Sequence, residues 1–110
     1  MKLDSVGVVI ATREIDIDDN GKVIVVIGMP QEFPDGRDFY CPYQILGMGR
    51  ENVRYGAGVD PVQALILTLQ IIGTDLYTSV AFKAGRLRYL GGKNLGFPVP
   101  GNISDIVPED

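Results

Sequence analysis

The segment from Gly58 to Leu65 reads as the abrupt start of one long, apolar helix. Asp60 is a preferred N-cap residue, because its carboxylate can accept the free backbone N–H groups of the first turn. Pro61 falls at the first helical position, where its missing N–H costs nothing, and Gln63 stands where a capping box places its reciprocal side chain. The three signals agree, so the sequence predicts strands before this point, one principal helix from Asp60 and a short ending after it.

Strand-like segments precede the helix, at residues 8–17, 22–29, 39–48 and 53–57. Asn20 and Gly21 separate the first two segments, and Asn-Gly between apolar runs is a strong hairpin signal. The second segment is apolar on both faces, which indicates a strand covered on both sides. Pro42 removes one ladder donor from the third segment, which indicates an edge strand or a bulge.

These segments predict an α+β fold. We expect an antiparallel sheet of about four strands with one long helix packed on one face. A short strand at residues 85–90 and a Gly/Pro-rich C-terminal segment should follow the helix.

A projection at about 100° per residue divides the helix into faces. One arc should lie on the sheet: Val62, Leu65, Ile66, Leu69, Ile72 and Leu76. A second apolar ridge, formed by Ala64, Leu67 and Ile71, lies on roughly the far side. A helix that covers an isolated sheet needs only the first arc, so the C-terminal segment or another protein chain should cover this ridge. Gly73 either ends the helix or weakens it within a longer one.

Composition and charge restrict the class of protein. A chain of 110 residues with 45% hydrophobic and 22% charged residues should fold as one domain over residues 1–110, with residues 1–5 and 101–110 mobile or bound to a partner. The net charge of −4 argues against nucleic-acid binding. The single cysteine excludes an internal disulfide and fits a reducing cytosol. Because the N-terminus lacks a signal-peptide layout and no apolar stretch approaches the ~20 residues of a membrane span, we expect a cytoplasmic protein without membrane contact.

No motif in the sequence predicts catalysis. The chain has no histidine, so the commonest general base is missing, and Cys41 lies in an aromatic segment typical of a buried structural thiol. Residues 16–21 match the first half of a calcium loop, but Ile27 stands where the closing glutamate belongs, so a hairpin turn with solvated acids explains them better. Residues 91–96 lack the ending of a phosphate loop. We therefore expect no catalytic residue, no metal ligand and no cofactor.

Several short segments together resemble one protein family: Ile-Gly-Met-Pro at residues 27–30, Phe-Tyr-Cys-Pro-Tyr-Gln-Ile at 39–45, Gly-Val-Asp-Pro-Val-Gln-Ala-Leu at 58–65, Leu-Arg-Tyr-Leu-Gly at 87–91 and Leu-Gly-Phe-Pro at 95–98. The combination is similar to a family of small bacterial domains of unknown function. Its most specific part is the Gly-Val-Asp-x-x-Gln-Ala-Leu helix start, and the similarity covers roughly residues 12–98. It implies a compact bacterial α+β domain without an assigned activity, so no site residue is carried over from it.

We expect a non-enzymatic protein-binding domain, in particular an immunity-type protein that binds and neutralises a bacterial toxin. A small acidic domain without motifs suits this role, since it has only to present a surface, and complementary charge speeds association with a basic toxin. The residues expected to contact the partner are acids in or near two turns: Asp18, Asp19, Glu32, Asp35 and Asp38.

Two alternatives remain open. The first is a homo-oligomeric structural domain, a homodimer that associates through the ridge of Ala64, Leu67 and Ile71. The second is a small-ligand-binding protein or enzyme that uses strand ends rich in tyrosine and arginine: Tyr40, Tyr43, Tyr55, Arg50 and Arg54. Scattered charges in turns are more often simply solvated, which weakens the second alternative.

Overall fold

A long antiparallel hairpin forms the first part of the sheet. The computed structural model describes residues 1–110, and β1 (Val9–Ile17) pairs with β2 (Gly21–Gly28) so that Ile17 lies opposite Gly21. The left-handed backbone of the connection falls on Asp18, whose φ is 57°, a conformation that Asp tolerates better than most residues. The predicted hairpin is confirmed, although Asp18 rather than the Asn-Gly pair supplies the left-handed residue.

Further strands complete the sheet: β3 (Gln31–Glu32), β4 (Phe39–Leu46), β5 (Arg54–Gly58) and β6 (Leu87–Arg88). β4 lies between β2 and β5, β6 pairs with the end of β1, and every pairing is antiparallel. The antiparallel α+β architecture is confirmed, with six strands instead of about four. The short strand expected after the helix is β6. The sequence did not predict β3, because its two exposed residues give no hydrophobic alternation.

Pro42 lies opposite an interruption of the neighbouring strand. β3 pairs with β4 in nearly the register that β2 uses, with Ile27 opposite Tyr43 and Gln31 opposite Tyr40. The short stretch of chain between β2 and β3 is therefore not paired with β4 near Pro42, the residue of β4 that has no N–H to donate. Because β4 also pairs with β5 along its other side, Pro42 marks an irregular stretch of ladder and not an edge strand.

Helix α1 (Pro61–Tyr77) begins as the sequence predicts. The Asp60 carboxylate accepts the backbone N–H of Gln63 at 2.8 Å, and the Gln63 side chain accepts the N–H of Val59 at 2.7 Å. Pro61 occupies the first helical position. The helix does not end at Gly73 but continues to Tyr77, and the short α2 (Val80–Lys83) follows it.

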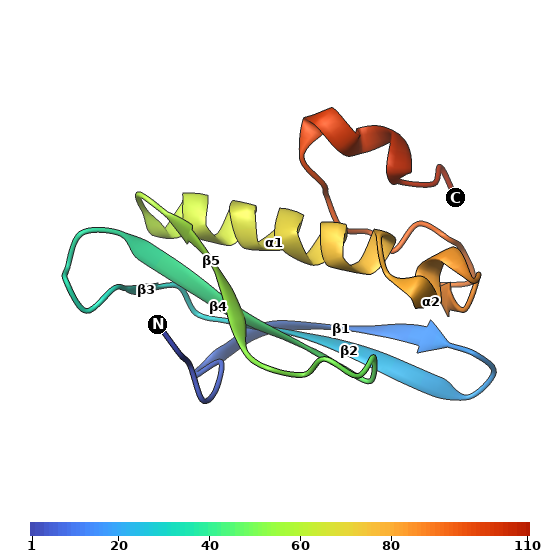
Figure 1. The fold of residues 1–110 in the computed structure, drawn as a ribbon, viewed down its shortest axis with the longest axis horizontal. Helices are drawn as coiled ribbons and strands as arrows, with labels where there is room; N and C mark the ends of the chain where they lie inside the picture. Colours follow the sequence, from blue (N-terminus) through green and yellow to red (C-terminus); the bar gives the residue numbers. More distant parts are fainter.

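α1 covers one face of the sheet (Figure 1), and Ile72 and Leu76 of the predicted sheet-facing arc are buried there, but the first half of the helix packs through a different side than its apolar pattern indicates. Its buried residues are Ala64, Thr68, Ile72, Gly73, Leu76 and Tyr77. Val62 and Ile66 are 65% and 49% exposed, so their assignment to the sheet-facing arc is wrong. Leu65 and Leu69, which belong to the same predicted arc, are only partly buried.

Two glycines of β5 decide which side of α1 meets the sheet. A Cβ at Gly56 would clash with Thr68, and a Cβ at Gly58 would clash with the backbone N of Ala64. The Thr68 hydroxyl accepts the N–H of Gly56 at 3.0 Å and donates to the carbonyl O of Cys41 at 3.1 Å. α1 therefore lies close on β4 and β5 through small and polar residues, because only that side fits the space and satisfies the buried backbone groups.

The outer face of the sheet carries no helix (Figure 1). On β2, Val23 and Val25 are fully buried beneath the helical layer, whereas Ile24 and Val26 on the other face are half-buried. The prediction that β2 is covered on both sides is therefore wrong. Cross-strand neighbours, among them Leu46 opposite Ile24, shield these side chains partially and take the place of a second layer.

The C-terminal segment completes the core from the helix side. Leu95 and Phe97 are buried, and the segment crosses α1 at Gly73, where a Cβ would run into the carbonyl O of Pro98. Beyond this crossing, the 3₁₀ helix η1 (Gly101–Ile106) stands above α1 (Figure 1). The side chain of Ile106 packs against the core.

We expect Asp60→Ala to lower the free energy of unfolding by about 1 kcal/mol, because the first turn loses its N-cap acceptor. Urea denaturation followed by circular dichroism measures this loss. Asp60→Asn is the matched control, since asparagine caps a helix as well as aspartate does. Unchanged stability in the alanine variant would contradict the capping role.

Gly73→Ala should lower the free energy of unfolding by about 1–3 kcal/mol, because the new methyl group meets the backbone of Pro98. The same change inside an ordinary helix raises stability by about 1 kcal/mol, so the sign of the effect is informative. Urea denaturation measures it, with the neighbouring Thr74→Ala as a control expected to change stability by no more than about 0.5 kcal/mol. A gain in stability for Gly73→Ala would mean that the segment is not held against α1.

Candidate functional site

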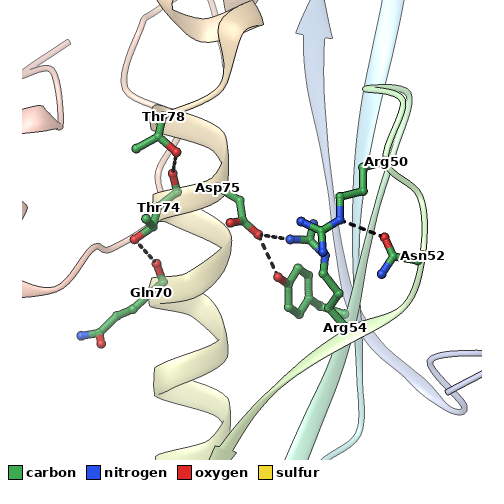
Figure 2. A network of polar contacts seen from close by, with 8 residues as sticks. Arg50, Asn52, Arg54, Gln70, Thr74, Asp75 and Thr78 are labelled. Atoms are coloured by element: carbon green, nitrogen blue, oxygen red, sulfur yellow. Dashed lines mark hydrogen bonds and ion pairs between the residues drawn. The ribbon is translucent and has the colours of Figure 1, made fainter. Parts of the chain in front are cut away.

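A cluster of three polar side chains joins α1 to β4 and β5. Tyr43 on β4 and Arg54 on β5 lie opposite each other in the ladder, and both donate to the same carboxylate oxygen, Oδ2 of Asp75 on α1. The Tyr43 hydroxyl lies 2.8 Å and Arg54 Nη1 2.7 Å from it (Figure 2). The Arg54 guanidinium also lies 4.9 Å from the centre of the Tyr43 ring. We call these three residues the Asp75 cluster. Their hydrogen bonds are charge-assisted and only partly exposed to solvent, which makes them stronger than surface contacts.

The phenol of Tyr43 stays protonated in this cluster. Burial raises its pKa above the ordinary 10.0, and the hydrogen bond to the Asp75 carboxylate and the charge of that group raise the pKa further; Arg54 and Arg50 oppose these effects only in part. Tyr43 therefore acts as a hydrogen-bond donor at neutral pH and not as a base.

A second guanidinium, that of Arg50, lies next to the cluster (Figure 2). Its Nε donates to the Asn52 side chain at 3.2 Å, and the turn that carries it is closed by Glu51, whose carboxylate accepts the N–H of Gly47 at 2.8 Å. A pocket of about 170 Å³ opens between these groups and is lined by Ile45, Met48, Arg50, Arg54 and Asp75. We call it the arginine pocket. It holds two guanidinium groups and one carboxylate.

The sequence offered a signal for this site that its interpretation missed. Asp75 is the only charged residue between Asp60 and Lys83, and an acid near the C-terminal end of a helix opposes the helix dipole. Such a residue is expected to have a specific partner. Asp75 was not among the candidate site residues predicted from the sequence.

The tyrosines of the predicted Tyr/Arg-rich site divide between two places. Tyr40 and Tyr55 pack with Phe33 in a cluster whose ring centres are 5.2–5.8 Å apart. They lie on the face of the sheet opposite Tyr43, since neighbouring residues in a strand point to opposite faces. Only Tyr43 joins the arginines.

Apolar side chains remain exposed along α1 and the residue before its N-cap. They are Val59, Val62, Ile66, Leu67 and Ile71, and we call this surface the α1 face. Leu67 and Ile71 are 37% and 36% exposed, and they line a shallow pocket of about 280 Å³ with Pro100 of the C-terminal segment. This pocket shares Asp75 with the arginine pocket, so the two adjoin. Ala64, which was grouped with Leu67 and Ile71, is fully buried against the sheet and does not belong to this surface.

The acids predicted to contact a partner do not form one surface. Asp18 and Asp19 lie in the β1–β2 turn, at the opposite end of the molecule from residues 31–38, which carry the other three, Glu32, Asp35 and Asp38 (Figure 1). Nε and Nη2 of Arg86 each donate to one carboxylate oxygen of Asp18 at 2.9 Å, and these bonds lower the pKa of the carboxyl. The position of these acids in the sequence did not predict a shared surface, because the strands between them place the two turns at opposite ends of the sheet.

The remaining candidates lie in structural settings. Cys41 is fully buried, as predicted; burial raises the pKa of its thiol. Asp16 in the calcium-like segment pairs with Lys22 across the hairpin. Asn94 in the glycine-rich segment accepts hydrogen bonds from the Tyr77 hydroxyl and the N–H of Gly96. Nowhere in the chain do three metal-ligating side chains of the His, Cys, Asp or Glu type come together, and none of its helices is both long and apolar enough to cross a membrane.

The raised pKa of Tyr43 predicts a loss of stability at alkaline pH. The neutral phenol stabilises the folded state fully below pH 10.0, and this contribution is lost as the pH rises above that value, because the unfolded chain ionises first. We expect the free energy of unfolding of the wild type to fall more steeply above pH 10.0 than that of Tyr43→Phe, which cannot ionise. Urea denaturation between about pH 8 and about pH 11 checks this. Parallel profiles for the two proteins would contradict it.

No curated protein and no solved structure matches the sequence. One family model matches residues 11–99, which is close to the range of 12–98 over which the resemblance was expected, and it describes an uncharacterised domain. The chain therefore belongs to the family described as Domain of unknown function (DUF6968).

Proposed function

We propose that this chain is a non-enzymatic protein-binding domain whose contact surface is the α1 face. The observation that carries the proposal is the exposure of large apolar side chains along the main helix, Val62 and Ile66 above all. Folded proteins seldom keep a contiguous apolar patch on a helix unless something covers it. The N-cap and the buried face of α1 are satisfied within the chain, so this exposed side is free for a partner.

The composition of the α1 face supports the same function. Between Pro61 and Thr74 the helix contains no charged residue, and charged residues are depleted in the buried centres of protein interfaces. Gln63 and Gln70 are its longest polar side chains, and amides adapt to either donors or acceptors on a partner.

Within this class we retain a bacterial immunity-type role, in which the partner is a basic toxin. Its support is the net charge of −4, which would speed association with a basic protein. The acids at the two ends of the sheet would then act through the overall field of the domain, since they are too far apart for a single contact patch.

A photo-crosslinking amino acid at Ile66 tests the proposal in the source organism. We expect one discrete adduct with another protein at Ile66. Leu90 provides the matched control, because it is also apolar and is 87% exposed but lies in the turn after β6 and not on α1. Absence of an adduct at Ile66, or the same adduct at Leu90, would contradict a docking role for the α1 face.

Light scattering on Leu67→Glu with Ile71→Glu separates a different partner from a second copy. We expect the wild type to be a monomer and the double variant to remain a folded monomer that loses the Ile66 adduct, because these partly exposed side chains can bring a carboxylate to solvent. A wild-type dimer that the two changes convert to a folded monomer would favour the homodimer instead. A double variant that unfolds would place the two residues in the core of the chain.

A further inference from the structure

The arginine pocket contains hydrogen-bond donors that the chain does not use. Arg54 reaches Asp75 through Nη1 only, and its Nε is buried without a partner. Arg50 uses Nε for Asn52, and neither of its terminal nitrogens makes a hydrogen bond. Buried donors without an acceptor are rare in folded proteins and need an explanation. Two guanidinium groups with free donors on one pocket are an arrangement that an oxyanion would complete.

The charge of the pocket favours a ligand with one negative charge. Arg50 and Arg54 are opposed by Asp75 alone, and Glu51 is directed to the backbone of Gly47. The local excess is therefore about one positive charge, in a chain whose net charge is −4. A monoanion neutralises this excess, whereas a dianion such as phosphate would leave one negative charge uncompensated beside the Asp75 carboxylate.

The shape and lining of the pocket restrict the ligand further. Its volume of about 170 Å³ accommodates a carboxylate with a few carbon atoms. Ile45 and Met48 supply the apolar part of its lining, which suits a short hydrocarbon body. A planar carboxylate also matches the fork of a guanidinium group, which can donate two parallel hydrogen bonds.

We propose that Arg50 and Arg54 form a binding site for a carboxylate that carries a short apolar group. The carboxylate accepts hydrogen bonds from donors that the chain leaves free on the two arginines, and its hydrocarbon part lies against Ile45 and Met48. Arg54 is held in place by Asp75 and the Tyr43 ring, and Arg50 by Asn52, so the ligand binds to groups that are already positioned. The carboxylate belongs either to a free small acid or to the C-terminus of a peptide chain.

Calorimetric titration of the purified chain with sodium isobutyrate tests the site, with isobutyramide as the neutral control of the same shape. We expect saturable binding of the acid and none of the amide. Arg50→Gln should weaken binding about tenfold or more, because it removes a charged donor. This exposed residue is not part of the fold's core, so the variant remains folded; Arg37→Gln, in the β3–β4 loop, is the matched control and should bind as the wild type does.

A second titration distinguishes the sources of the carboxylate. The dipeptide acetyl-Ala-Val with a free C-terminus is compared with its C-terminal amide. Binding of the free dipeptide about tenfold tighter than isobutyrate identifies a chain terminus as the ligand, and similar affinities identify a small acid. Either result supports the site.

The proposal is overturned if neither acid binds at about 10 mM, if the amides bind equally, or if Arg50→Gln binds as well as the wild type. These outcomes are independent of the α1 face, because the crosslinking experiment at Ile66 does not involve Arg50. Failure of one proposal therefore leaves the other standing.

Discussion

The close approach between α1 and β5 is the constraint on which the rest of the structure depends. Gly56 and Gly58 present no side chain to the helix, and Thr68 fills the space with a hydroxyl that connects Gly56 to Cys41 of β4. Each such bond contributes about 1 kcal/mol net, but leaving the buried groups unpaired would cost about 1–3 kcal/mol for each group. The buried threonine is therefore compatible with only one rotation of the helix, although the apolar pattern of α1 allows several.

That rotation of α1 produces both the Asp75 cluster and the α1 face. Asp75 follows Thr68 by about two helical turns and so lies on a similar side of α1, which brings it over the ladder position where Tyr43 and Arg54 lie opposite each other. The same rotation turns Val62 and Ile66 away from the sheet. One rotation of α1 on the sheet thus explains two features. It places the polar cluster on one side of the helix and leaves an exposed apolar strip on the other.

The distribution of charge differs from what the net charge suggests. The ion pairs at Asp16 and Asp18 engage acids at one end of the sheet, and the remaining acids of residues 31–38 lie at the other end (Figure 1). At the Leu67 and Ile71 end of the α1 face, however, the charged groups that line the two adjoining pockets are Arg50, Arg54 and Asp75. A partner that approaches through a long-range field meets an acidic protein, whereas a group that docks beside α1 meets a locally positive pocket.

Local features of the fold could be predicted from the sequence because they depend on residues that are neighbours in the chain. The cap at Asp60, the hairpin around Asn20 and the buried Cys41 follow from backbone hydrogen bonding and from the alternation of side chains. The side of α1 that packs on the sheet was not readable in this way. Hydropathy reports where apolar side chains point, but the glycines of β5 and the two bonds of Thr68 determine which side fits.

The candidate site shows the same division. The sequence by itself determined that Asp75 is a lone acid in an apolar helix, that Arg50 and Arg54 flank a turn, and that the chain is acidic. Only the tertiary structure brought Asp75 to Tyr43 and Arg54, and only the lengths of the strands placed Asp18 and Asp38 at opposite ends. The physical reason is that a helix position acquires its partners from elements far away in the sequence, through steric fit and buried hydrogen bonds that no local pattern encodes.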